Sequence, residues 1–130
     1  MLEAIRGTAG RPSTVQSGNF TGEVWRDAIR DLDADGPSIG NVFFAPSART
    51  YWHAHDDGQL LIAIAGSGWV VDEDGPVKLA AGDMVWVPEG VRHWHGASAD
   101  QYMIHTSLSK TRETDWQAEV TDEEFLAVEQ

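Results

Sequence analysis

The sequence predicts an all-β domain, built as a barrel or a sandwich. From Val42 onward, short apolar segments alternate with turn residues at near-regular spacing. The turn residues form five groups: Asp56-Asp57-Gly58, Gly66-Ser67-Gly68, Asp74-Gly75-Pro76, Gly82-Asp83 and Pro88-Glu89-Gly90. Each group supplies a residue that accepts positive φ, or a proline with its fixed φ, as a tight turn requires. Many short strands with such spacing are typical of sandwiches and barrels rather than of parallel α/β sheets.

The organisation of the chain follows from this pattern. Residues 1–18 are expected to form a loose arm or an edge strand, residues 19–112 the barrel, and residues 113–130 a tail with a short helix. Residues 31–37 predict a loop, because they combine turn formers with like charges. Strands are predicted at Phe20–Trp25, Tyr51–His55, Gln59–Ala65, Trp69–Asp72, Val77–Leu79, Met84–Val87, Val91–His95 and Gln101–Ser107.

Apolar residues indicate where the core lies and where the chain ends in a helix. The run Leu60–Ala65 has no alternation of apolar and polar residues, which predicts a central strand covered on both faces. Thr121 precedes Glu124 by three positions and an apolar run follows, a capping-box signature that predicts a short C-terminal helix. Four tryptophans from several predicted strands are expected to fill the barrel or an interface: Trp52, Trp69, Trp86 and Trp94.

Composition and charge exclude several classes of function. With 130 residues, 42% of them hydrophobic, the chain is long enough for one domain with its own core. The net charge of −12 argues against nucleic acid and anionic membrane as partners. The absence of cysteine excludes disulfides, thiolate metal sites and a cysteine nucleophile. Because no segment has the apolar core of a secretion signal or the length of a membrane span, we expect a cytoplasmic protein.

All five histidines lie in the β-rich part of the chain. His53 and His55 are two residues apart, so both side chains project from the same face of a strand. Gln59 follows a turn and begins the next strand, and His93 arrives from a distant strand. Three neutral imidazoles and one amide oxygen predict a divalent-metal site with His53, His55, Gln59 and His93 as ligands. An isolated histidine in a strand is more often structural, so the prediction depends on the combination with the flanking turns.

The spacing of these residues resembles the two sequence motifs of the cupin superfamily. The positions that match are His53, His55, Gln59 and Gly66 for the first motif, and Gly82, Pro88, Gly90 and His93 for the second. The resemblance implies a double-stranded β-helix, or jelly-roll barrel, with the metal site inside it.

Three positions depart from the family pattern. Gln59 stands where cupins usually have an acidic ligand, Ser47 where they have a glycine, and Ala97 where they have an asparagine. Without the carboxylate, the double charge of the ion is not compensated by its ligands, which predicts a stronger Lewis acid and somewhat weaker metal binding. Amide and imidazole donors suit manganese, iron, nickel and zinc alike.

Two further histidines are candidates for proton transfer. His95 lies two residues beyond His93 and is expected on the same inward face, and His105 lies in the last predicted strand. Neither is needed as a ligand, and a neutral imidazole suits acid–base chemistry near neutral pH. The alternatives are equally open: His95 orients His93, or His105 is a hydrogen-bonded core residue.

A wider set of residues resembles the bacterial cupin hydroxynitrile lyases, over residues 20–124. The matching segments are Phe20-Thr21-Gly22, Ala48-Arg49-Thr50, Trp52–His55, Gly58-Gln59, Ala65–Trp69, His93–Ala97, Asp115-Trp116 and Val120–Glu123. The resemblance implies a manganese-dependent enzyme that reversibly cleaves small cyanohydrins to an aldehyde or ketone plus hydrogen cyanide.

The reaction implied by this resemblance assigns a role to each candidate residue. The metal would bind the cyanohydrin hydroxyl, His105 or His95 would accept its proton, and the ion with an imidazolium would stabilise the departing cyanide. Arg49 and Thr50 precede the ligands and are candidates to contact the substrate. Strict alternation along the strand places Arg49, and not Thr50, on the ligand side.

Two other functions stay open on the same scaffold. Neutral donors with open coordination positions also suit an iron or nickel dioxygenase. A binding module for a small molecule, without catalysis, would need no proton carrier. The family resemblance also implies a homodimer or a larger homo-oligomer, because cupins commonly pair through exposed strands and residues 1–18 are placed to exchange between subunits.

Overall fold

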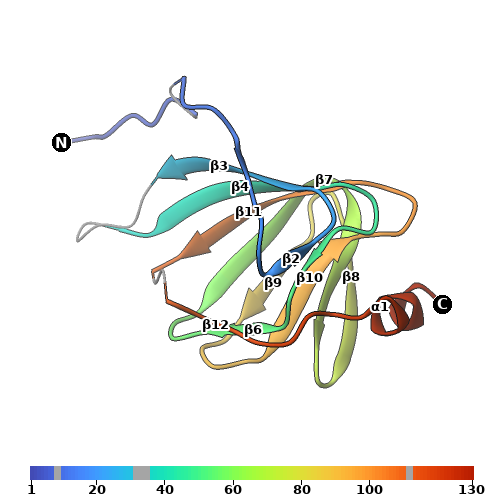
Figure 1. Cartoon of the computed structure of the whole chain (residues 1–130). Coiled ribbons are helices and arrows are strands. Elements are labelled where there is room, and N and C mark those ends of the chain that lie inside the picture. Colours follow the sequence, from blue (N-terminus) through green and yellow to red (C-terminus); the bar gives the residue numbers. More distant parts are fainter. Residues whose placement is uncertain (8–9, 31–35, 111–112) are drawn as a thin grey trace.

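The computed structural model describes residues 1–7, 10–30, 36–110 and 113–130. These residues form twelve strands and one helix, which confirms the all-β fold class (Figure 1). Most of the loop predicted at residues 31–37 lies outside the described residues. The strands are β1 (Thr14–Val15), β2 (Phe20–Thr21), β3 (Val24–Arg30), β4 (Ser38–Phe44), β5 (Arg49–Thr50), β6 (His53–His55), β7 (Gln59–Asp72), β8 (Gly75–Ala80), β9 (Met84–Val87), β10 (His93–Ala97), β11 (Met103–Ser109) and β12 (Thr114–Trp116), and the helix is α1 (Asp122–Glu129).

The strands form a curled sheet with two layers, and β7 belongs to both layers. The hydrogen-bonded order along the main path is β1-β3-β4-β11-β7-β10-β5-β2. The first half of β7 pairs with β11 and β9, and its second half pairs with β10 and β8. Figure 1 shows β3, β4 and β11 side by side in one layer, with β10 and β8 in the other. The long β7 therefore joins the two layers around one interior.

Glycines mark two places where the predicted strand boundaries are wrong. The turn expected at residues 66–68 is a change of direction within the continuous strand β7. Gly66 has a φ of 72°, and a Cβ atom there would lie 1.8 Å from the carbonyl oxygen of Tyr102. The strand expected at Phe20–Trp25 is divided into β2 and β3 by Gly22, which has a φ of 82°. In both places the positive φ bends the chain without ending the sheet.

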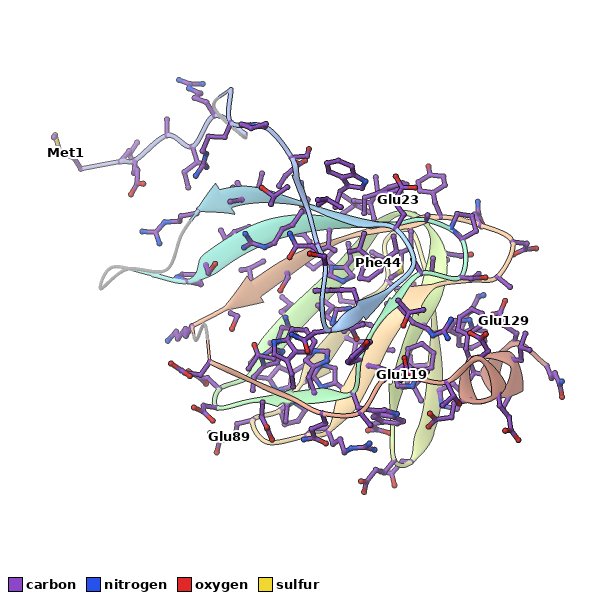
Figure 2. The ribbon with its side chains drawn as sticks, viewed as in Figure 1. Met1, Glu23, Phe44, Glu89, Glu119 and Glu129 are labelled. Carbon is purple, nitrogen blue, oxygen red and sulfur yellow. The ribbon has the colours of Figure 1, made fainter. Side chains whose placement is uncertain are left out.

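Two apolar clusters stabilise this arrangement. The first fills the interior between the layers and includes the fully buried Val24, Phe44, Leu61 and Met103. Figure 2 shows Phe44 pointing into this interior. The second cluster lies between β10 and the C-terminal segment, and its buried members are Trp52, Val71, Trp94, Val120 and Phe125. The helix thus covers the outside of one layer.

The capping box predicted for the C-terminal helix is confirmed. The Thr121 side chain accepts a hydrogen bond from the backbone N–H of Glu124, and the Glu124 side chain accepts one from the backbone N–H of Thr121. Phe125 is the buried residue of α1. Among the described residues, no helix has the length and apolar character that a membrane span requires.

The outer face of the layer that contains β3, β4, β11, β7 and β9 carries several exposed apolar side chains on β7 and β9. Leu61 and Ala63 of β7 point inward and are buried, whereas Ile64 is 48% exposed. On the neighbouring β9, Met84 is 62% and Trp86 61% exposed. The prediction that Leu60–Ala65 is a central strand is confirmed. The prediction that it is covered on both faces is wrong for a single chain.

Candidate metal centre

Three imidazoles meet inside the barrel because two short strands pair in one register. β6 and β10 are antiparallel, with His93 directly opposite His53. His55 follows His53 by two positions, and the ring centroids of His53 and His93 are 4.2 Å apart. One nitrogen atom from each of His53, His55 and His93 lies within 4.8 Å of the other two, so these residues could hold a metal ion. The convergence predicted from the His-x-His spacing is present.

Backbone carbonyls set the tautomer of two of these imidazoles. Nδ1 of His53 donates to the carbonyl oxygen of Tyr51 at 2.8 Å, and Nδ1 of His93 donates to that of Val91 at 2.9 Å. A neutral imidazole with its proton on Nδ1 has a lone pair on Nε2. Both rings therefore present Nε2 as an acceptor, which is the form that a metal ion requires.

The side-chain oxygen of Gln59 is one of several buried polar atoms that have no hydrogen-bond partner among the described residues. Its Nε2 donates to Oγ of Ser107 at 2.8 Å, which occupies the nitrogen end of the amide. Its Oε1 is buried and unpaired, as are Nε2 of His55 and Nε2 of His93. Buried polar atoms without hydrogen bonds are uncommon and destabilising. The nitrogens of His53, His55 and His93 suit a divalent cation, and the buried Oε1 of Gln59 is a candidate for a fourth ligand, so the residues present fit the metal that the fold family implies.

Burial keeps the candidate ligands uncharged. Burial lowers the pKa of His93 to about 4. Burial, and next the proximity of His93, lower the pKa of His53 well below its usual value. Burial also lowers the pKa of His55. The three rings are therefore neutral at pH 7, and their lone pairs are available for coordination.

His95 and His105 form a hydrogen-bonded pair next to the three candidate ligands, with the ring centroid of His95 5.3 Å from that of His53. Nε2 of His105 and Nδ1 of His95 are 2.9 Å apart, so one of these nitrogens donates to the other. Nδ1 of His105 is buried without a hydrogen-bond partner among the described residues. Burial lowers the pKa of His105 to about 4 and, with the proximity of His105, lowers that of His95 well below its usual value. The predicted inward orientation of both residues is present in the structure.

A cavity of about 400 Å³ brings most of the candidate residues together. Six of the residues predicted as ligands or catalytic groups line it: Thr50, His53, His55, Gln59, His95 and His105. Sequence reasoning missed Arg26, Phe44 and Trp116 among the lining residues. Trp116 lies on β12, which pairs with β6, so the predicted C-terminal tail adds a strand beside His53 and His55. No local sequence pattern predicts this long-range pairing of β12 with β6.

The predicted orientations of Arg49 and Thr50 are wrong. Thr50 lines the cavity, and its Oγ1 accepts a hydrogen bond from the backbone N–H of His95 at 3.2 Å. The guanidinium of Arg49 instead contacts the carboxylate of Asp122 at 2.8 Å and the carbonyl oxygen of Val120 at 2.9 Å. Strict alternation fails because residues 51–52 interrupt the extended chain between β5 and β6. Arg49 thus connects the barrel to the C-terminal helix.

Fold and site together define a small β-barrel with an interior histidine cluster suited to a metal ion. The chain belongs to the cupin family, because residues 40–107 match the Cupin domain family. It is 40% identical over 113 residues to an (R)-mandelonitrile lyase of Granulicella tundricola, covering 82% of this chain and 85% of that protein.

Solved structures support the same family. The chain superimposes with a TM-score of 0.83 on a cupin-like protein from Thermotoga maritima, with 31% identity, covering 91% of this chain and 94% of that chain. The polyketide cyclase RemF from Streptomyces resistomycificus has a TM-score of 0.73 and 13% identity, with 96% and 91% covered. At that lower identity the likeness extends to the fold alone.

Proposed function

We propose that this protein is a divalent-metal-dependent lyase that reversibly cleaves cyanohydrins to an aldehyde or ketone plus hydrogen cyanide. The observation that carries the proposal is the division of the interior histidines into two groups. One nitrogen from each of His53, His55 and His93 lies within 4.8 Å of the other two, while His95 and His105 form a neutral, hydrogen-bonded pair that lines the cavity together with Gln59. A site of this kind suits several reactions, and the similarity to a mandelonitrile lyase supports cyanohydrin cleavage over the others.

The proposed ligands are His53, His55, Gln59 and His93, with manganese as the resident ion and iron, nickel or zinc as alternatives. A bound divalent ion would supply a Lewis acid for the substrate hydroxyl. All four proposed donors are neutral, so the protein leaves the positive charge of the site uncompensated. Such a site favours a substrate whose hydroxyl is becoming an anion.

His105 is the proposed base. When its Nε2–H donates to His95, Nδ1 of His105 holds a lone pair and lacks another partner among the described residues. This nitrogen accepts the hydroxyl proton while the bond to the cyano carbon breaks and its electron pair leaves with cyanide. The imidazolium then returns the proton to cyanide, which gives hydrogen cyanide and the carbonyl product. His95 keeps His105 in this tautomer.

Other cavity residues position the substrate. Thr50 lines the cavity and fixes the backbone of His95, so it is the proposed polar contact. Phe20, Val42 and Trp116 offer an apolar wall for the organic group. Arg49 has no place in the proposed reaction, because its guanidinium lies against the C-terminal segment.

The test is to prepare metal-free protein and reload it separately with Mn²⁺, Fe²⁺, Ni²⁺ and Zn²⁺. Mandelonitrile is added, and benzaldehyde release and oxygen consumption are recorded together. We expect metal-dependent benzaldehyde release that is lost in His105→Gln. Oxygen consumption without cleavage would replace the lyase with a dioxygenase. Inactivity with every metal would leave a binding module.

We further propose a homodimer that pairs through the apolar outer face. Register places Trp86, Leu60, Leu108 and Ile39 in one row across four strands, and the next row runs from Met84 and Ile62 to the polar Thr106 and Asn41. With strands about 4.8 Å apart, five strands give a face on the order of 500 Å² per copy. Two such faces bury about 1,000 Å², which is the threshold for a biological interface and corresponds to a weak dimer. A two-fold axis would bring this face into contact with the same face of a second chain.

A further inference from the structure

The cavity contains one cation that the proposed reaction does not use. Arg26 lies on β3, two residues after the buried Val24, and it lines the cavity. Its guanidinium lies over Gly40 of β4, since a Cβ atom on Gly40 would be 2.7 Å from Nη2 and 2.9 Å from Nε of Arg26. The space for the guanidinium therefore exists because residue 40 has no side chain.

Arg26 has no counter-ion among the residues that the structure describes. No hydrogen bond or ion pair joins its guanidinium to another residue in the described part of the chain. Although the sequence has 21 acidic residues and a net charge of −12, none of the described residues lining the cavity is acidic. Arg26 is half-buried, so its guanidinium is partly removed from water yet still within reach of a ligand that enters the cavity. The cavity thus holds a positive group whose binding capacity is unused.

The register of the sheet places this cation on the same wall as the proposed base. Arg26 is directly opposite Val42, and Val42 is directly opposite His105. Arg26 and His105 are therefore two strand spacings apart, about 10 Å between their backbones. Gly40, under the guanidinium, is opposite Ser107, whose hydroxyl accepts from Gln59. One small molecule in the cavity can contact both Arg26 and the reacting groups.

We propose that Arg26 binds a carboxylate of the substrate, so that the natural substrate is a small carboxylate-bearing molecule. Its carboxylate faces β3 and its reacting carbon faces His105. The planar guanidinium presents two parallel N–H donors that match the two oxygens of a carboxylate. Cleavage of such a substrate rests on the proposed lyase function, whereas binding of the carboxylate rests only on Arg26 and its surroundings.

The anion site is tested by binding. The full-length protein is titrated by calorimetry with 4-(hydroxymethyl)benzoate and with its neutral counterpart 4-(hydroxymethyl)benzamide, after chelation and again after reloading with Mn²⁺. Charge-assisted hydrogen bonds correspond to about a ten- to hundredfold gain in affinity. We expect that preference for the carboxylate in both states. Equal affinity for the two compounds would refute the anion site.

Two variants and one control show whether Arg26 is responsible. Arg26→Met is expected to abolish the preference. Gly40→Ala is expected to weaken it, because the new methyl group occupies the space under the guanidinium. Arg6→Met removes the same charge from the exposed N-terminal arm and is expected to keep the preference. A preference that survives both Arg26→Met and Gly40→Ala would overturn the assignment.

Activity separates this proposal from the lyase function. With mandelonitrile and 4-carboxymandelonitrile as alternative substrates, we expect a lower KM for the carboxylate substrate and a loss of that difference in Arg26→Met. If neither compound is cleaved but the carboxylate preference in binding persists, the lyase function fails and the anion site stands. If both are cleaved with equal KM, the anion site fails and the lyase function stands.

Discussion

Acidification measures how strongly the fold holds its interior histidines in the neutral state. Burial lowers the pKa of His93 and of His105 from 6.5 to about 4. Between these values the unfolded chain binds protons that the native state does not, so stability falls as the pH falls from 6.5 toward 4. Each of the two residues accounts for a loss of about 2 kcal/mol between pH 7 and pH 5. Lower pKa values of His53 and His95 act in the same direction.

The assay is urea unfolding of the metal-free protein at closely spaced pH values from 7 to 5. We expect the free energy of unfolding to fall by at least about 4 kcal/mol over this range. The matched variant is His105→Gln, which keeps a polar side chain but removes one titrating group. Its free energy of unfolding is expected to change with pH by about 1 kcal/mol per unit less than that of the wild type, averaged from pH 7 to pH 5. Parallel curves for the two proteins would refute the argument that His105 is buried as a neutral group.

Three further predictions concern the metal, the outer face and the bend in β7. Gln59→Glu is expected to bind Mn²⁺ at least as tightly as the wild type and to release benzaldehyde more slowly, because a carboxylate compensates the charge of the ion. Metal titration measures the affinity and benzaldehyde release measures the turnover, and an unchanged turnover would contradict the prediction. Trp86→Glu is expected to reduce the mass measured by sedimentation from that of a dimer to that of one chain of 14.3 kDa, whereas Val77→Glu, on an exposed strand of the other layer, leaves the mass unchanged. A dimer that persists in Trp86→Glu would exclude the face around β7 and β9 as the interface. In urea unfolding, Gly66→Ala is expected to destabilise the protein by about 2–4 kcal/mol more than Gly75→Ala, because both glycines have positive φ but only a Cβ atom at residue 66 would lie against the Tyr102 carbonyl. An equal loss of stability in the two variants would show that the backbone shifts to relieve this contact.

The histidine cluster was predictable because its information is local. His53 and His55 need only the two-residue period of a strand to share a face, and the turn before Gln59 returns the chain beside them. His93 required the family motif, because its pairing with His53 joins strands separated by 40 positions in the sequence. Trp116 belongs to a segment that matches the lyases, but nothing local predicted its place in the cavity, since β12 is a short strand that pairs with β6 through a long-range contact.

Errors in orientation arose where a regular period was extended across an irregular segment. Arg49 and Thr50 were assigned by counting back from His53, but residues 51–52 are not part of a strand. Leu60–Ala65 was interpreted as covered on both faces, which a single chain does not achieve. Such an uncovered run is the pattern expected when a second copy supplies the other layer.

Arg26 could have been found by the same period, had the first strand been extended correctly. The predicted strand ended at Trp25, so no phase was assigned to the residues beyond it. The actual strand continues to Arg30, with Val24 fully buried on the inner side and Trp25 facing outward. The two-residue period then places Arg26 on the same inner face as Val24. A charge at an inward position contradicts the pattern of a packed core, and such contradictions are expected where a fold carries a binding site.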